Sequence, residues 1–297
     1  MIPSNNIPEN LDELQNWLHT KEQKTANKEA GPIVPGTEKL VVWSGGSPIQ
    51  TAISLVYIHG FVGSRQSLAP ALEQLASKLE ANIFFTRLAG CGQGPDAIGK
   101  VHAEDWVQDT IEAWEIGAAI GRKVILIGMS TGCPQAAWCT TIKPQTAALI
   151  MISANFWPAK RIRAALLLAP FGYLLARVFI GKYHDLSSDP QPDSKFYTNP
   201  HHVKSLITMM KMVQLGRKAA LESITCPSLM IYTEEDKVVS VSAIKKAYAR
   251  LGSLSKKLVN IEAAKDHELG STIRAPEILP LLSKLITEFI EKEVLNK

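Results

Sequence analysis

This 297-residue chain has few cysteines, no long apolar run and little net charge. Its cysteines (Cys91, Cys133, Cys139 and Cys226) have neither CxxC spacing nor the framework pattern of a disulfide-rich domain. We therefore expect reduced thiols and a cytoplasmic protein. The formal net charge of +4 is small and scattered. It argues against a surface that binds nucleic acid.

Membrane-spanning and signal segments are also missing from the pattern. The longest apolar candidate, residues 164–176, is bounded by Arg163 and Arg177 and interrupted by a proline and a glycine. A membrane span needs roughly 20 apolar residues, so we expect none. The first residues, MIPSNNIPENLDELQNW, are polar and acidic, whereas a signal peptide is basic and then apolar.

What the chain does have is an alternation of apolar β-type runs with helical patterns. Runs such as 124–127 and 147–152 are continuously hydrophobic, which is typical of strands covered on both faces. The alternation predicts an α/β fold with a doubly wound, mostly parallel sheet. The expected strands are 39–43, 53–58, 82–88, 124–127, 147–152, 228–232 and 257–261.

Two regions lie outside this alternation. Residues 10–29 have apolar positions at helical spacing, and the glycines and prolines that follow indicate a linker. Between 153 and about 200 an apolar helical stretch is followed by a proline-rich one, and we interpret this insertion as a lid over the ligand site. The predicted segments are an N-terminal helix and linker (1–37), a first core part (38–154), a lid (155–200) and a second core part (201–297). We also expect a hairpin-type turn at 44–48.

The most informative motif is Gly128-Met129-Ser130-Thr131-Gly132, which directly follows the buried run 124–127. A strand that ends in Gly-x-Ser-x-Gly and leads into a helix is the nucleophile elbow of serine hydrolases. The two glycines are needed because side chains in so tight a turn would collide with neighbouring backbone. Ser130 is therefore the candidate nucleophile.

Serine needs a base within hydrogen-bond reach, and the base needs a carboxylate to orient it. In the fold that carries this elbow, the acid and then the histidine follow the serine in the sequence, each on a loop after a later strand. Asp236 and His267 occupy those loops, and no other histidine lies downstream. Glu234 and Glu235 remain alternatives for the acid. Asp266 adjoins the histidine in sequence, so its side chain would diverge from the ring.

Backbone amides must also stabilise the oxyanion that forms during acyl transfer. One donor is expected from Thr131, directly after the nucleophile, and the second from Phe61, in the loop that follows His59-Gly60. Gly60 allows the close approach of backbone. His59 precedes the serine, so we assign it a structural, hydrogen-bonded role.

Taken together, these motifs resemble α/β-hydrolase-fold serine hydrolases and are similar to bacterial carboxylesterases and monoacylglycerol lipases. The resemblance runs from about residue 38 to the end and implies a helical lid inserted after the sixth strand. Relatives in which one large residue follows His-Gly take medium or long acyl chains. The chain departs from them at Gly90-Cys91-Gly92, where such relatives often have Gly-His-Gly. The motifs that carry the resemblance are Ile58-His59-Gly60-Phe61, 128–132, Asp236-Lys237-Val238-Val239 and Asp266-His267.

We hypothesise that the protein is a serine hydrolase that cleaves small-molecule acyl esters through an acyl-enzyme. The expected substrates are medium-chain acyl esters or monoglycerides. Thioesterase, amidase and C–C hydrolase chemistry could use the same triad, and a non-catalytic ligand-binding protein on this fold is a further alternative. Cys91 is a minor rival nucleophile because it has no elbow. We expect no metal and no organic cofactor.

The remaining expectations concern contacts and packing. The apolar segment 166–180 could also touch lipid transiently, and the protein is expected to be a monomer or a homodimer. We interpret His201-His202 as the surface start of a helix rather than a metal pair, because adjacent side chains point apart. Met209, Met210 and Met212 are expected in the core, and an acyl pocket lined by methionine is the alternative.

Overall fold

The computed structural model describes residues 6–26, 31–186 and 194–296. Its main sheet has seven strands in the order β1-β3-β2-β4-β5-β8-β9, and all neighbours except β1 and β3 run parallel. The predicted α/β fold with a mostly parallel sheet is confirmed. The strands are β1 (Leu40–Val42), β2 (Thr51–Ile58), β3 (Asn82–Phe85), β4 (Gly121–Met129), β5 (Ala148–Ile152), β8 (Ser228–Tyr232) and β9 (Lys256–Asn260).

The expected hairpin at 44–48 is wrong. β1 pairs antiparallel with β3 and not with β2, although β2 follows it in the chain. The buried Asn82 side chain explains this path, because it accepts a hydrogen bond from the Ser44 amide (2.8 Å) and donates to the Ile49 carbonyl (2.7 Å). These bonds tie the loop after β1 to the start of β3.

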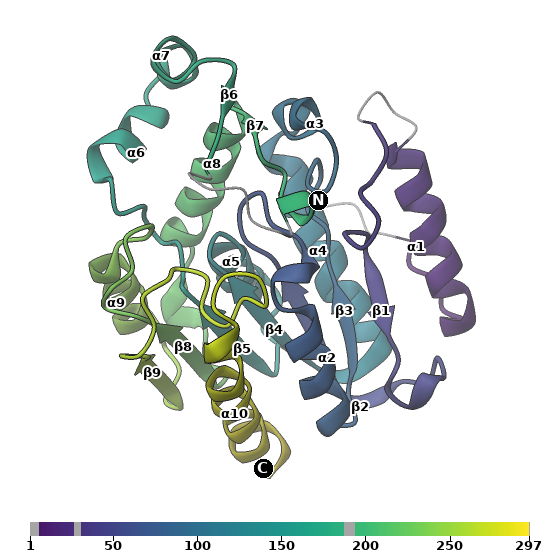
Figure 1. Cartoon of the computed structure of the whole chain (residues 1–297). Coiled ribbons are helices and arrows are strands. Elements are labelled where there is room, and N and C mark those ends of the chain that lie inside the picture. The colour runs from purple at the N-terminus through teal and green to yellow at the C-terminus, as the bar shows by residue number, and fades with distance from the viewer. Residues whose placement is uncertain (1–5, 27–30, 187–193, 297) are drawn as a thin grey trace.

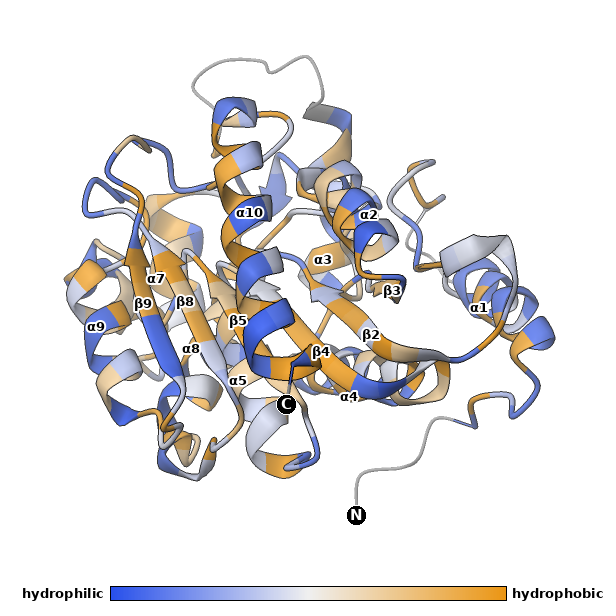
Figure 2. Cartoon of the chain, turned by 90° about the horizontal axis from the view of Figure 1, so that it is seen from below, coloured by the Kyte–Doolittle hydropathy of each residue, from blue (hydrophilic) through white to orange (hydrophobic). Residues whose placement is uncertain are grey.

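Helices cover both faces of the sheet (Figures 1 and 2). Along β2, Val56 and Ile58 join one apolar cluster while Leu55 and Tyr57 join the other. Successive side chains of a strand point to opposite faces, and both faces are buried here, which accounts for the continuous hydrophobic runs. One face carries α2 (Ala69–Lys78) and α10 (Leu279–Ile290); the other carries α4 (Ala103–Ile120), α5 (Gly132–Ile142), α8 (Ser205–Lys218) and α9 (Val241–Arg250).

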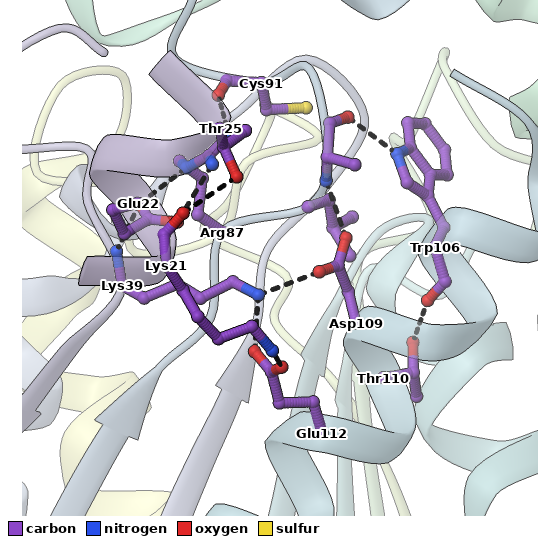
Figure 3. Close-up of polar contacts among 12 residues, drawn as sticks. Lys21, Glu22, Thr25, Lys39, Arg87, Cys91, Trp106, Asp109, Thr110 and Glu112 are labelled. Carbon is purple, nitrogen blue, oxygen red and sulfur yellow. Dashed lines mark hydrogen bonds and ion pairs between the residues drawn. The ribbon is translucent and has the colours of Figure 1, made fainter. Parts of the chain in front are cut away.

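The N-terminal helix α1 (Leu11–Ala26) packs on the core of its own chain, with Leu14 and Leu18 fully buried. Figure 3 shows the polar contacts that accompany this packing. The Arg87 guanidinium donates from Nε and Nη2 to the two carboxylate oxygens of Glu22, at 2.8 and 2.9 Å. Both side chains are buried, so this fork-shaped ion pair joins α1 to the loop after β3.

The insertion comes between β5 and α8 and contains α6 (Arg161–Leu167), α7 (Gly172–Phe179), β6 (Tyr183–His184) and β7 (His201–His202). It follows the fifth strand of the described chain rather than a sixth, because only β1 precedes β2. Its helices extend beyond the ends of the parallel strands, at the top of Figure 1. The proline-rich stretch 189–193 lies outside the described residues. The boundaries at 37, 154 and 200 stay predictions.

The interpretation of His201-His202 as a surface helix start is wrong. These residues form β7, which pairs antiparallel with β6, and α8 begins only at Ser205. The His201 ring is fully buried between the rings of Phe61 and His184, with centroids 5.0 and 5.3 Å away. The two adjacent side chains do point apart, since His202 packs instead against Tyr173 and Tyr183.

The Glu22–Arg87 pair makes the attachment of α1 testable. Glu22→Gln leaves a buried guanidinium without its counter-charge, and breaking such a pair costs about 3–5 kcal/mol. We expect urea unfolding to show a loss of that order. Glu13→Gln, on the exposed face of the same helix, is the control and should change stability by less than about 0.5 kcal/mol. Equal effects of the two substitutions would contradict the proposed contribution of the ion pair.

Candidate active site

The candidate nucleophile lies in a sharp turn between β4 and α5. Ser130 has φ +49°, a left-handed conformation that is strained for a residue with a side chain. A Cβ added at Gly132 would lie 2.1 Å from the Ile58 carbonyl oxygen, and one added at Gly128 would lie 2.7 Å from the Cys133 Cα. Both glycines are therefore required by close backbone approach, as expected of the elbow.

The structure brings the three predicted side chains together. His267 Nε2 lies 2.8 Å from Ser130 Oγ, and His267 Nδ1 lies 2.7 Å from Asp236 Oδ2. The other carboxylate oxygen of Asp236 accepts from the Val238 and Val239 amides at 2.8 and 2.9 Å. Burial acts to raise the pKa of Asp236, but the His267 contact and the two amides outweigh it and hold this pKa below its ordinary value.

The rival acids lie elsewhere. Glu234 is exposed, where it accepts from the Tyr232 hydroxyl at 2.7 Å and pairs with Lys245. Glu235 is also exposed. Asp266 accepts from the Glu268 amide at 2.9 Å. Among the described carboxylates near the histidine, Asp236 is the one hydrogen-bonded to its ring.

The two predicted oxyanion donors flank the serine. A Cβ on Gly60 would lie 3.2 Å from the Ser130 Cβ, so the loop that carries Phe61 runs directly beside the nucleophile. Thr131 follows the serine at the start of α5. Within the described part of the chain, neither the Phe61 nor the Thr131 amide donates to a protein acceptor. Both N–H groups are therefore unused beside the Ser130 hydroxyl.

His59 holds the oxyanion loop in place. Its ring is fully buried, Nε2 accepts from the Leu88 amide at 3.0 Å, and Nδ1 lies 2.8 Å from the Gly60 carbonyl oxygen. These contacts define the neutral tautomer with hydrogen on Nδ1. Burial lowers the pKa of His59 to about 4, which keeps the ring neutral. The structure thus supports its hydrogen-bonded role.

Above these groups lies a cavity of about 480 Å³, a size typical of small-molecule sites. One wall is apolar and is formed mainly by the insertion and α8; its residues include Phe61, Ala164, Leu167, Ile180, Leu206 and Met209. Met209 therefore faces the cavity, whereas Met210 and Met212 are buried in the core. The core interpretation is confirmed for Met210 and Met212, whereas Met209 lines the cavity.

Another part of the cavity lining is polar. The Tyr197 hydroxyl donates to Glu268 Oε2 at 2.5 Å, and the Arg274 guanidinium lies 3.5 Å from the other oxygen of Glu268. Ser67 Oγ is 3.5 Å from the Tyr197 hydroxyl. These four residues come from three distant segments and all line the cavity. We name them the polar wall; sequence reasoning missed it, because no spacing in the chain links the segments.

Comparison with known proteins identifies the family. Residues 50–270 match the family model described as serine aminopeptidase, S33. The match spans more than half of the sequence and contains Phe61, Ser130, Asp236 and His267.

The chain belongs to this family.

Individual relatives agree with this assignment. The chain is 23% identical over 228 residues to a thermostable monoacylglycerol lipase of Bacillus sp. (strain H-257), which covers 76% of the chain and 88% of that protein. A solved structure of metagenome-derived lipolytic enzymes, LipS and LipT, matches with a TM-score of 0.72 and 23% identity, over 88% of this chain and 99% of that one. The monoacylglycerol lipase of Paleococcus ferrophilus matches with a TM-score of 0.62 and 16% identity, over 85% and 97%. The predicted α/β-hydrolase fold and the resemblance to monoacylglycerol lipases are confirmed.

Cys91, the rival candidate nucleophile, is fully buried. Burial raises the pKa of its thiol to about 12, so the reactive thiolate is not formed near neutral pH. Among the described residues, no three His, Cys, Asp or Glu side chains are grouped so that they could hold a metal ion. No helix in the described part of the chain is both long and apolar enough to cross a bilayer.

The buried His201 predicts a pH dependence of stability. Burial lowers its pKa to about 4, from an unfolded value near 6.5. As the pH falls from 6.5 towards 4, the unfolded chain binds a proton that the folded chain excludes, so the free energy of unfolding falls by up to about 1.4 kcal/mol per pH unit for this group. His201→Phe should reduce the difference between urea unfolding at pH 7 and at pH 5 by about 1–2 kcal/mol.

The exposed His19 on α1 provides the control. His19→Gln should leave the pH dependence of the wild-type protein unchanged. If His201→Phe also left it unchanged, the buried imidazole would not be the source of the acid sensitivity.

Proposed function

We propose that the protein hydrolyses carboxylic esters through an acyl-enzyme on Ser130. The observation that carries the proposal is the continuous hydrogen-bonded chain from Asp236 through His267 to Ser130, which ends at a cavity beside two unused amides. This arrangement supplies a nucleophile, a base, an orienting carboxylate and oxyanion donors.

In the proposed reaction, Ser130 Oγ attacks the ester carbonyl carbon while His267 Nε2 takes the hydroxyl proton. The Phe61 and Thr131 amides donate to the carbonyl oxygen, which becomes negatively charged. The intermediate then expels the alcohol, which leaves with the proton from His267, and the acyl group stays on Ser130. Water repeats the sequence with His267 as the base and releases the acid. Asp236 keeps the Nδ1–H tautomer and stabilises the imidazolium.

The two walls of the cavity favour a particular kind of ester. The apolar wall suits a hydrocarbon acyl chain, which gains roughly 0.8 kcal/mol for each CH₂ that it buries. The polar wall offers hydroxyl, carboxylate and guanidinium groups to an alcohol that carries further hydroxyls. These features, together with the named monoacylglycerol lipases among the relatives, support a medium-chain ester or monoglyceride as substrate.

The family description also names an aminopeptidase, but the charges of the cavity argue against that activity here. An aminopeptidase must bind a substrate ammonium group, which a surplus of negative charge in the cavity would favour. The lining instead has more basic than acidic side chains: Lys160, Arg163, Lys237 and Arg274 against Asp266 and Glu268. The geometry therefore favours an ester over a peptide with a free amino end.

The same triad could also cleave thioesters and C–C bonds next to a carbonyl. The hydrogen-bonded triad argues against the other alternative, a non-catalytic ligand-binding protein, because ligand binding alone does not require it. The predicted cytoplasmic location, and the monomeric or homodimeric state, stay predictions of the sequence.

Substitution of the triad tests the proposal. Ser130→Ala and Asp236→Asn should each lower kcat/KM for a nitrophenyl ester by about a thousandfold or more, because one loses the nucleophile and the other loses the oriented tautomer. Glu234→Gln, a nearby exposed carboxylate, is the matched control and should stay within about twofold. Equal losses in Asp236→Asn and Glu234→Gln, or an active Ser130→Ala variant, would contradict these roles.

The polar wall predicts selectivity for the alcohol. Glu268→Gln should lower kcat/KM for a monoglyceride by about tenfold or more, because one charged hydrogen bond is worth roughly 1.5–3 kcal/mol. Hydrolysis of the nitrophenyl ester of the same fatty acid, which has no alcohol hydroxyls, should change by less than about threefold. A uniform loss on both esters would mean that Glu268 supports the His267 loop and does not select the alcohol.

A further inference from the structure

The outer surface of the insertion is unusually apolar. On α7, Val178 and Phe179 are 69% and 82% exposed, and Ile162 on α6 is 80% exposed. Only Gly172 and Ala176 of α7 are buried, so the helix touches the rest of the molecule along a narrow stripe. Contiguous apolar surface of this kind on a folded protein marks an interaction site. We name it the lid surface; its large apolar residues are Ile162, Leu166, Phe171, Leu174, Val178 and Phe179.

The charged side chains on α6, α7 and the loops that flank them are all basic. The sequence contains no aspartate or glutamate between residues 116 and 184, whereas the insertion up to His184 contains five basic residues: Lys160, Arg161, Arg163, Arg177 and Lys182. Lys182 pairs with Asp96, and Arg161 donates to two serine hydroxyls. Within the described residues, Lys160, Arg163 and Arg177 have no ion-pair partner. Apolar side chains and unpaired cations are therefore presented together.

The same segment forms a wall of the cavity. Lys160, Arg163, Ala164, Leu167 and Ile180 line it, while the apolar residues between and after them face outward. Figure 1 shows α6 and α7 at the end of the molecule that lies above the sheet, away from α10 and the C-terminus. A partner bound to the lid surface would therefore lie directly next to the cavity.

We propose that the lid surface docks on a bilayer that contains anionic phospholipid. The apolar side chains would enter the boundary between headgroups and acyl chains, while the arginines and lysines bind the lipid phosphates. A second copy of the chain is a poorer occupant, because two lid surfaces face to face would bring their unpaired cations together, and residues 116–184 contain no acidic residue to offset them. Docking would hold the cavity against the source of an apolar ester.

Vesicle flotation tests the proposal on the full chain. All proteins carry Ser130→Ala, so that neither hydrolysis of lipid nor the proposed activity affects the result. Phosphatidylcholine vesicles with or without phosphatidylglycerol are compared at low and at high salt. We expect the protein to float with the anionic vesicles, and to do so less at high salt and on pure phosphatidylcholine.

Two matched pairs of variants locate the surface. Phe179→Asp should lower partition to anionic vesicles by about tenfold or more, and Leu254→Asp, at a fully exposed leucine remote from the lid surface, by less than about twofold. Arg177→Gln should lower partition by about fivefold, and Arg122→Gln, exposed at the start of β4, by less than about twofold. The thermal unfolding midpoint of each variant verifies that it is folded.

Three results would overturn the proposal. The first is the absence of flotation with either vesicle. The second is an equal loss in the lid variants and their controls. The third is a dimer in sedimentation velocity that dissociates on Phe179→Asp without any flotation of the parent protein, because the occupant would then be a second copy.

Discussion

The close approach of α5 to the end of β2 is the constraint on which the site depends. With no side chain at Gly132, the backbone after Ser130 passes so near the Ile58 carbonyl oxygen that even a methyl group would overlap it. That approach forces Ser130 into its left-handed conformation and sets it beside Gly60. The strain is local and is held by a sheet whose faces are both covered by packed helices. One steric requirement thus places the hydroxyl and the Phe61 and Thr131 amides together.

Strand order then supplies the remaining groups. Because β4, β5, β8 and β9 are neighbours and run parallel, the loops after β8 and β9 open at the same edge as the elbow. Asp236 and His267 reach the serine from those loops, although they lie 106 and 137 residues from it in the sequence. The Val238 and Val239 amides keep the carboxylate of Asp236 charged and oriented. The His267 ring is thus oriented by a carboxylate that is itself held by backbone amides.

Much of this could be predicted from the sequence. The Gly-x-Ser-x-Gly motif has a local steric cause, and the order of acid and histidine follows from a parallel sheet, so Ser130, Asp236 and His267 were all identifiable. Contacts between distant side chains were not, because periodicity carries no signal for them. The Glu22–Arg87 pair and the polar wall of Tyr197, Glu268 and Arg274 are of this kind.

The errors have related causes. The path of β1 depends on hydrogen bonds from one buried asparagine, Asn82, which alternation alone does not reveal. The pair His201-His202 looked like a polar surface, since histidine is usually exposed or liganded. In the structure, His201 instead belongs to an aromatic cluster in which the insertion packs against Phe61. The polarity of histidine therefore failed to predict the burial of His201, because a neutral imidazole ring can be buried without a counter-charge.

The central claim is that the Ser130 hydroxyl is activated by His267, and covalent labelling with a fluorophosphonate tests it most directly. The account predicts one adduct per native chain, mapped by peptide mass spectrometry to Ser130, and absent after the protein is unfolded in urea. A native protein that does not react, or an adduct on another residue, would contradict it.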